Sequence, residues 1–571
     1  MTFSIKFNIP ENPNYYSGSH VAGLYNELED IERTDERAQN ELEKLVTKLH
    51  ALKGEAQYPE NWVPPSYLTP NNSIGLDLCL LLAKKLKSNL TLTTVDLSYN
   101  EIKDEGTMAL SKAIKANSTL ITLDLSANNL GGEGARALSE ALIENTSLTT
   151  LSLSCNWIGD QGVQALSEVL QVNSTLSTLG LKDNLIEDAG LRMLCDTLKI
   201  NTTLTNLDIA LNSMGDQGSQ ALSEALKRNS TLITLNLSGN RMKGRGTQAL
   251  SEGLKSNRTL TTLRVNDNSI GEQGAQALAE ALKTKSALTT LYLSSNMIRN
   301  GGVQALSVAL ESNSTLTTLD LTVNYIAADG AKALAKALKI NTSLTTLILN
   351  CNEVGCDGAK ALAVSLKKNS TLQTLDMNAN NISDDGAEAL SEALKTNSTL
   401  TTLNLGNNKI GLNGAKALSE ALKTNPALAT LDLGGSNIGD GGAGALAEAL
   451  KINTTLTTLH LYGGSIGSYG AKAMTEALKI NSTLTTLNLR NNTIESCGAT
   501  ALSEALKTNS TLTTLKLGRN RIDSSGAKEL AKALKINSTL RSLDLGYNSF
   551  SSRKLLDTAL KINSTVVITY R

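Results

Sequence analysis

The sequence predicts an α/β solenoid, in which short strands and helices alternate along one stack of repeats. Two observations predict it. A pattern L-x-x-L-x-L-x-x-N-x-I begins at Leu92, recurs at Leu120, and continues with this same period as far as Leu540, which makes 17 repeats without an insertion or deletion. The segment 389–403 is also repeated without change at 501–515, a distance of four repeats. Self-similarity of this kind indicates one continuous array rather than several globular domains.

Each repeat contains two hydrophobic periods. Around Leu123 and Leu125 apolar and polar residues alternate, which predicts a short half-buried strand. In the segment 134–142, two Ala-Leu pairs fall on one helical face. Glycine opens this helix in sixteen successive repeats, from Gly106 to Gly526, and we expect that a side chain there would hold neighbouring turns apart.

Two asparagines recur in each repeat. Asn128 and its equivalents follow the strand, where a buried amide can satisfy turn backbone groups that have no ladder partner. Asn117 and its equivalents follow the helix, usually within Asn-Ser-Thr, and we expect them to end it in a left-handed conformation. We interpret this triplet as a turn rather than as a glycosylation acceptor.

Stacking of the repeats predicts curvature. Helices are about 10 Å wide, whereas neighbouring strands are about 4.8 Å apart. The stack must therefore curve, with a parallel sheet on the concave face and helices on the convex face. Leu92 and its equivalent in every later repeat should be buried.

This pattern resembles the ribonuclease-inhibitor type of leucine-rich repeat (LRR) protein, to which the LRR domains of NOD-like receptors also belong. The resemblance implies a curved LRR horseshoe that recognises a protein partner. Animal ribonuclease inhibitors are cysteine-rich, whereas this chain has six cysteines, so inhibition of a ribonuclease is not implied. The near-identical repeats also resemble LRR effectors that intracellular bacteria deliver into host cells, which would place the chain in a host cytosol.

The two ends differ from the repeat, and the expected domains follow from them. Residues 1–56 predict a strand and an amphipathic helix over 21–52, which either caps the solenoid or docks a partner as a coiled coil. Residues 57–70 hold four of the seven prolines and form a stiff connector. The solenoid covers 71–571, and its C-terminal cap, at about 550–571, ends in a strand. We expect a monomer, with a dimer through 21–52 as the alternative.

The composition and the first residues limit the partners and the location that we expect for the protein. The net charge is −1 and aromatics make up 3% of residues, so we expect no nucleic-acid partner. No apolar run approaches the length of a membrane span, which predicts no membrane insertion. The first residues lack the apolar segment of a secretory signal, and we expect a cytoplasmic protein with reduced thiols.

No catalytic or metal-binding arrangement is recognisable. The chain has three histidines and no CxxC pair, so we predict no metal site and no cofactor. No nucleophile–base arrangement stands out, and we predict no catalytic residues and no enzyme. The alternative is a GTPase-activating protein of the Ran type, which has LRRs of the same kind and would use a loop arginine or asparagine.

Recognition residues are expected where the repeats vary, because the buried positions barely change. The position between the two strand leucines, Asp96 and its equivalents, should be exposed on the concave sheet. It is Asp in seven repeats, which we interpret as a solvated surface, but Arg264, Tyr292, His460 and Lys516 occur in others. Arginine and aromatic side chains are typical interface anchors.

One stretch breaks the repeat rules. The regular asparagine is lost twice in succession, to Ser436 and Gly464, and paired glycines in these turns should open room beside the sheet. His460 and Tyr462 alternate on one predicted strand, and Arg490 takes the position of Tyr462 one repeat later. This predicts an aromatic spot flanked by cations, suited to an acidic or phosphorylated protein surface; the alternative is a decayed repeat with no ligand. The predicted partner-binding residues are His460, Tyr462, Arg490, Lys516 and Arg519, with Arg264 and Tyr292 as a second candidate near Met297 and Tyr325.

Overall fold

A computed structural model describes residues 80, 82–284, 286–550 and 566–569. The chain divides into two compact units, one of residues 1–268 with 285–288 and the other of 269–284 with 289–571. Each is described by itself. The predicted N-terminal segment 1–56, the connector 57–70 and most of the C-terminal cap lie outside the described residues.

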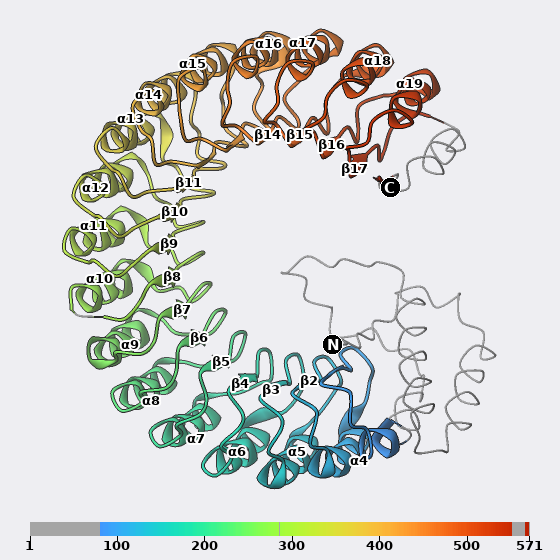
Figure 1. Cartoon of the computed structure of the whole chain (residues 1–571). Helices are drawn as coiled ribbons and strands as arrows, with labels where there is room; N and C mark the ends of the chain where they lie inside the picture. The colour runs from blue at the N-terminus through green and yellow to red at the C-terminus, as the bar shows by residue number, and fades with distance from the viewer. Residues whose placement is uncertain (1–79, 81, 285, 551–565, 570–571) are drawn as a thin grey trace. The chain divides into compact units, whose positions relative to one another are not determined.

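The first compact unit alternates three-residue strands with helices (Figure 1). Its described elements are β1 (Thr94–Asp96), α4 (Lys103–Ala116), β2 (Thr122–Asp124), α5 (Gly132–Glu144), β3 (Thr150–Ser152), α6 (Gly159–Leu170), β4 (Thr178–Gly180), α7 (Asp188–Leu198), β5 (Asn206–Asp208), α8 (Asp216–Leu226), β6 (Thr234–Asn236), α9 (Gly244–Ser256) and β7 (Thr262–Arg264).

The second compact unit continues the same alternation and adds a terminal strand. Its described elements are α10 (Gly271–Leu282), β8 (Thr290–Tyr292), α11 (Arg299–Leu310), β9 (Thr318–Asp320), α12 (Ala328–Leu338), β10 (Thr346–Ile348), α13 (Gly355–Leu366), β11 (Thr374–Asp376), α14 (Asp384–Leu394), β12 (Thr402–Asn404), α15 (Leu412–Leu422), β13 (Thr430–Asp432), α16 (Gly439–Leu450), β14 (Thr458–His460), α17 (Ser468–Leu478), β15 (Thr486–Asn488), α18 (Glu495–Leu506), β16 (Thr514–Lys516), α19 (Ser524–Leu534), β17 (Ser542–Asp544) and β18 (Val567–Thr569).

The strands form parallel ladders in the predicted register. Within each compact unit every strand pairs with that of the next repeat, so that Leu123 lies beside Leu151 and Leu431 beside Leu459. In both units the strands line the inner side of the curve and the helices the outer side (Figure 1). The predicted α/β solenoid of LRR repeats is confirmed.

The core consists of the repeated leucines. Leu92 and its equivalent in every later repeat, as far as Leu540, are at most 2% exposed, which confirms the predicted burial. The position between the strand leucines is less exposed than expected. Its side chains are half-buried in most repeats, and Asp96 and Asn488 are buried. The tight spacing of parallel strands causes this, because neighbouring side chains of the same column cover one another.

The helix-opening glycine behaves as predicted. A Cβ on Gly302 would lie 2.5 Å from Cγ2 of Ile298 in its own turn and 2.8 Å from Cβ of Ala275 on α10. Both distances are shorter than carbon atoms tolerate. The glycine therefore sets the close approach of neighbouring helices.

Side chains of one repeat satisfy backbone groups of another. After the strand, Asn128 Nδ2 donates to the carbonyl of Leu97 in the preceding repeat, and Asn128 Oδ1 accepts from the amide of Asn100 at 2.9 Å. This confirms the predicted role of the first asparagine.

The second asparagine makes a ladder that was not expected from the sequence. Asn117 has φ −81° and ψ 132°, so the expected left-handed conformation is wrong. Its Nδ2 donates to Leu86 O at 2.7 Å and its Oδ1 accepts from Leu120 N at 2.8 Å. The side chain, rather than the backbone angle, shapes this turn.

Helix starts are also capped from the preceding repeat. Asp188, at the start of α7, accepts from the amides of Gly215 and Gly218 at 2.7 and 2.9 Å. A carboxylate at a helix N-terminus satisfies unpaired amides and interacts favourably with the helix dipole. Sequence reasoning within single repeats could not find this contact.

The C-terminal strand is present. β18 pairs in parallel with β17, and Val567 lies beside Ser542, which itself lies beside Thr514. The last strand therefore follows its neighbour at a shorter spacing than the regular period of the array. In the described part of the chain no helix is both long and apolar enough to cross a membrane.

Truncating a core leucine should destabilise the array. Leu321 is fully buried in the repeat that begins at Leu316, and Leu321→Ala should lower the free energy of unfolding by about 2–5 kcal/mol through the cavity it leaves. Urea unfolding followed by circular dichroism measures it. Ile340→Ala, at a side chain 56% exposed, is the control and should change little. Equal effects would contradict the assigned core.

Glycine substitutions should separate helix packing from helix propensity. Gly302→Ala should lower the melting temperature, because the new methyl meets Ile298 and Ala275. Gly444 lies within α16, and a Cβ added there would meet no atom within 4 Å, so Gly444→Ala should be neutral or stabilising, by up to about 1 kcal/mol. A stabilised Gly302→Ala variant would refute the close helix approach.

Candidate functional site

Two columns of side chains leave the concave face of the sheet. They are Asp96 with its equivalents in later repeats, at the end of each strand, and Ser98 with its equivalents, two positions farther along the chain; we call them the concave columns. Side chains of the first column also accept hydrogen bonds from the backbone. Asp124 Oδ1 accepts from the amide of Ser126 at 2.8 Å, and Asn404 Oδ1 accepts from Gly406 in the same way at 2.9 Å. Asp and Asn therefore close the backbone turn that follows the strand.

Tyr462 fills the room that the glycines leave. A Cβ on Gly434 would collide with the ring of Tyr462, so the ring lies over this glycine. The Tyr462 hydroxyl accepts from Asn407 Nδ2 at 3.4 Å. Gly434 thus makes space for a neighbouring aromatic ring, where an open space was expected from the sequence.

Acidic groups surround this ring. Burial raises the pKa of the Tyr462 hydroxyl, and the nearby carboxylate of Asp432 raises it further. His460 lies directly beside Asp432 on the neighbouring strand. Burial also raises the pKa of Asp432, although the amide of Gly434 and the charge of His460 oppose the shift. We call Asp432, His460 and Tyr462 the acidic–aromatic cluster.

The cations gather farther along the array. The Arg490 guanidinium lies 3.8 Å from the Asp544 carboxylate, and Lys516 lies beside Asp544 in the strand register. Arg519 stacks on Tyr547, with the guanidinium carbon 4.7 Å from the ring centroid, and both side chains are exposed. We call Arg490, Lys516 and Arg519 the basic cluster.

The predicted site is therefore two neighbouring clusters. The ring of Tyr462 leans toward Gly434 and Asn407, whereas Arg490 reaches in the other direction toward Asp544. Tyr547 was missed by sequence reasoning, although a tyrosine one repeat after an exposed arginine is a signal that could have found it.

The two residues of the second candidate belong to different compact units. Arg264 ends β7 in the first unit, and Tyr292 ends β8 in the second; both side chains are half-buried.

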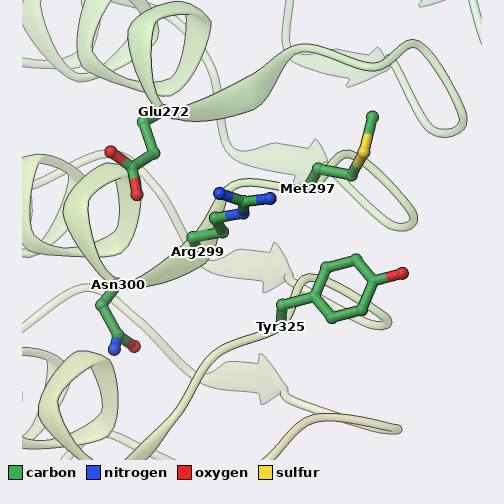
Figure 2. Close-up of a pocket in the computed structure, with 5 residues that line it drawn as sticks. All are labelled: Glu272, Met297, Arg299, Asn300 and Tyr325. Carbon is green, nitrogen blue, oxygen red and sulfur yellow. The ribbon is translucent and has the colours of Figure 1, made fainter.

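A pocket lies in the second compact unit where strand-to-helix loops meet the first residues of α10 and α11. It has a volume of about 400 Å³ (Figure 2). We call it the rim pocket; it is lined by Glu272, Met297, Arg299, Asn300 and Tyr325. Met297 and Tyr325 were noted from the sequence as neighbours of the second candidate, whereas Glu272 and Arg299 were missed. No group of three or more His, Cys, Asp or Glu suited to a metal ion occurs among the residues that the structure describes.

Comparison with family models identifies the class. A model described as "Leucine Rich repeat" matches residues 88–111, 116–139, 144–167, 172–195 and 537–553. This is a protein of the leucine-rich repeat class. A second model, the NLRC3 LRR domain, matches residues 192–521, more than half of the chain. The chain belongs to this family of LRR domains.

Two solved structures show similarity to parts of the chain. Leiomodin-1 actin-binding site 2 is 28% identical over 27% of this chain and 89% of its own length, with a TM-score of 0.24. The internalin InlF of Listeria monocytogenes is 21% identical over 67% of this chain and 89% of its own, with a TM-score of 0.39. No curated protein sequence matches the chain.

The raised pKa of Asp432 predicts a pH-dependent effect of Asp432→Asn. A folded-state pKa above the unfolded value means that stability is lost as pH rises through the two values. The variant removes this loss and keeps an acceptor for Gly434, as Asn404 does for Gly406. It should therefore gain stability over the native chain at pH 7, and the gain should disappear below about pH 4.

Urea unfolding at pH 3, 5 and 7 measures this difference. Asp357→Asn, an exposed change of the same charge on α13, is the control. A gain that is equal at all three pH values would show that burial of the Asp432 charge is not its source.

Proposed function

We propose that the chain is a protein-recognition scaffold that binds a protein partner on its concave face. LRR domains generally mediate protein–protein recognition. One observation supports the concave face as the surface that binds the partner. The buried columns keep leucine from repeat to repeat, whereas the concave columns change, and four of their basic and aromatic side chains follow one another between β14 and β17: His460, Tyr462, Arg490 and Lys516. Surface positions that vary between repeats, on a backbone that does not, can determine which partner is bound.

The basic cluster favours an acidic partner surface. Arg490 pairs with the carboxylate of Asp544, and Lys516 lies beside Asp544 in the strand register, so two cations stand near one carboxylate. Arg519 is held flat by Tyr547, which reduces the ordering cost when its donors meet a carboxylate or a phosphoryl group. An acidic or phosphorylated protein segment fits this arrangement.

The acidic–aromatic cluster would meet a different part of the same partner. Tyr462 presents a ring whose position is fixed by the Gly434 backbone and by Asn407. Asp432 and His460 beside it can accept and donate hydrogen bonds. A partner segment with an apolar or hydrogen-bonding side chain next to its acidic stretch would engage both clusters.

The proposal extends to the oligomeric state of the chain and to the cellular compartment in which it binds its partner. We infer a binding role without catalysis, on a monomer or on a dimer joined through 21–52. A cytosolic setting is supported by the described cysteines, which are free thiols: Cys155, Cys195, Cys351, Cys356 and Cys497.

An affinity capture with matched charge variants tests the face. The immobilised chain should retain a partner from cell lysate, and the variant Arg490→Ala/Lys516→Ala/Arg519→Ala should lose it. The control, Lys451→Ala/Lys479→Ala/Lys507→Ala, removes the same charge from the convex helices, where these lysines form only exposed ion pairs. Equal loss in both variants would exclude a specific concave contact.

A double substitution with one change in each cluster should then test whether these side chains anchor the partner. With the captured partner, Tyr462→Ala combined with Arg490→Ala should weaken binding by more than about 2 kcal/mol if these side chains are anchors. Isothermal titration calorimetry measures the affinity, and circular dichroism confirms that the variant is folded. Unchanged affinity in a folded variant would move the search to Arg264 and Tyr292.

A further inference from the structure

The rim pocket combines one cation with two exposed apolar side chains. Met297 is 43% exposed and Tyr325 is 56% exposed, and Arg299 is exposed beside them. Figure 2 shows the guanidinium of Arg299 between Glu272 on the helix side and Met297 on the loop side, with the ring of Tyr325 on the next loop. Tyrosine, methionine and arginine are the residue types enriched in the cores of protein interfaces.

Arg299 makes no ion pair within the described part of the chain. The lysines that follow α10 and α15 differ, since Lys283 and Lys423 each lie 2.6 Å from a glutamate three residues earlier in the chain. The side-chain oxygen of Asn300 already accepts from the amides of Ala327 and Gly330. These two hydrogen bonds occupy it, so Arg299 does not share a ligand with it. Arg299 is therefore the charged donor that the pocket offers.

The backbone at Arg299 is left-handed, as it is at other helix starts of the array. Its φ is 56°, in the left-handed region, and the equivalent positions one repeat earlier and two repeats later are Gly271 and Gly355, with φ 65° and 60°. Glycine adopts this conformation without steric cost, whereas arginine does not. Lys103 and Glu495 take the same conformation at the equivalent position of their repeats, so this backbone belongs to the turn of the repeat and sets where the Arg299 side chain leaves the helix start.

We propose that the rim pocket binds an acidic side chain of a protein segment, whose apolar neighbour packs on Met297 and Tyr325. The planar guanidinium of Arg299 would hold the carboxylate through paired hydrogen bonds. Glu272 disfavours a second carboxylate on the helix side. The pocket uses no residue of the concave columns, so this site does not depend on the proposed concave-face function.

Peptide selection tests the proposal without a known partner. A library of random heptapeptides displayed on phage is selected on the intact native chain and on Arg299→Gln. We expect the peptides lost on the variant to carry Asp or Glu next to Leu, Ile, Met or Phe. Identical selections on both proteins, or lost peptides without an acid, would overturn the proposal.

Fluorescence anisotropy of the best lost peptide then isolates each contact. Replacing its carboxylate by the amide should weaken binding at least tenfold on the native chain and less than twofold on Arg299→Gln. Tyr325→Ala should weaken it at least fivefold, Arg299→Lys should restore part of the affinity, and Glu272→Gln should favour peptides with a second acid. Arg245→Gln, an exposed arginine on α9, is the control and should leave binding unchanged.

The same measurements separate the two sites. Arg490→Ala should bind the peptide as the native chain does, whether or not the concave face recognises a partner. An amide peptide that binds the native chain as tightly as the acidic one would refute the role of Arg299.

Discussion

The fold depends on the satisfaction of turn backbone groups by asparagine side chains from neighbouring repeats. A short strand cannot pair all the polar groups of the turns on either side. Asn128 and Asn117 supply the missing donors and acceptors at the two turns, one after the strand and one after the helix. An unpaired buried amide or carbonyl costs more free energy than one hydrogen bond returns, so the two asparagine columns hold the repeats in a single register.

Much of this architecture could be predicted because it is periodic. The regular period placed the strands from β1 to β17 and the leucine that opens each repeat, and one repeat was enough to infer the role of Asn128 and of the helix-opening glycine. The role of Asn117 was only half recognised, since its type is typical of helix ends while its contacts at Leu86 and Asn89 lie in the preceding repeat. The capping of one helix by Asp188 of the preceding helix was missed for the same reason.

The candidate site was predictable in composition but not in arrangement. Sequence columns indicated which side chains share the concave face, yet they do not specify in which direction along the array each side chain leans. Tyr462 turns toward the repeat that lacks a side chain at Gly434, and Arg490 turns toward the carboxylate of Asp544. These directions depend on packing and charge interactions between neighbouring repeats whose residues differ. A consensus sequence of the repeat does not contain those differences. Ser436 replaces the regular asparagine in the repeat of Gly434, and Gly464 replaces it in the repeat of Tyr462. The asparagine column is therefore interrupted where the concave surface is most altered.

The uniform register of the strand ladders has an evolutionary consequence. Because interior repeats present the same leucines and asparagines to both neighbours, duplication or deletion of the coding sequence for one whole repeat leaves each remaining junction with the same partners. The near-identity of segments such as 389–403 and 501–515 also favours unequal recombination between them. The length of the array, and with it the spacing between its distinctive side chains, can therefore change by whole repeats in a single genetic event while the fold is preserved.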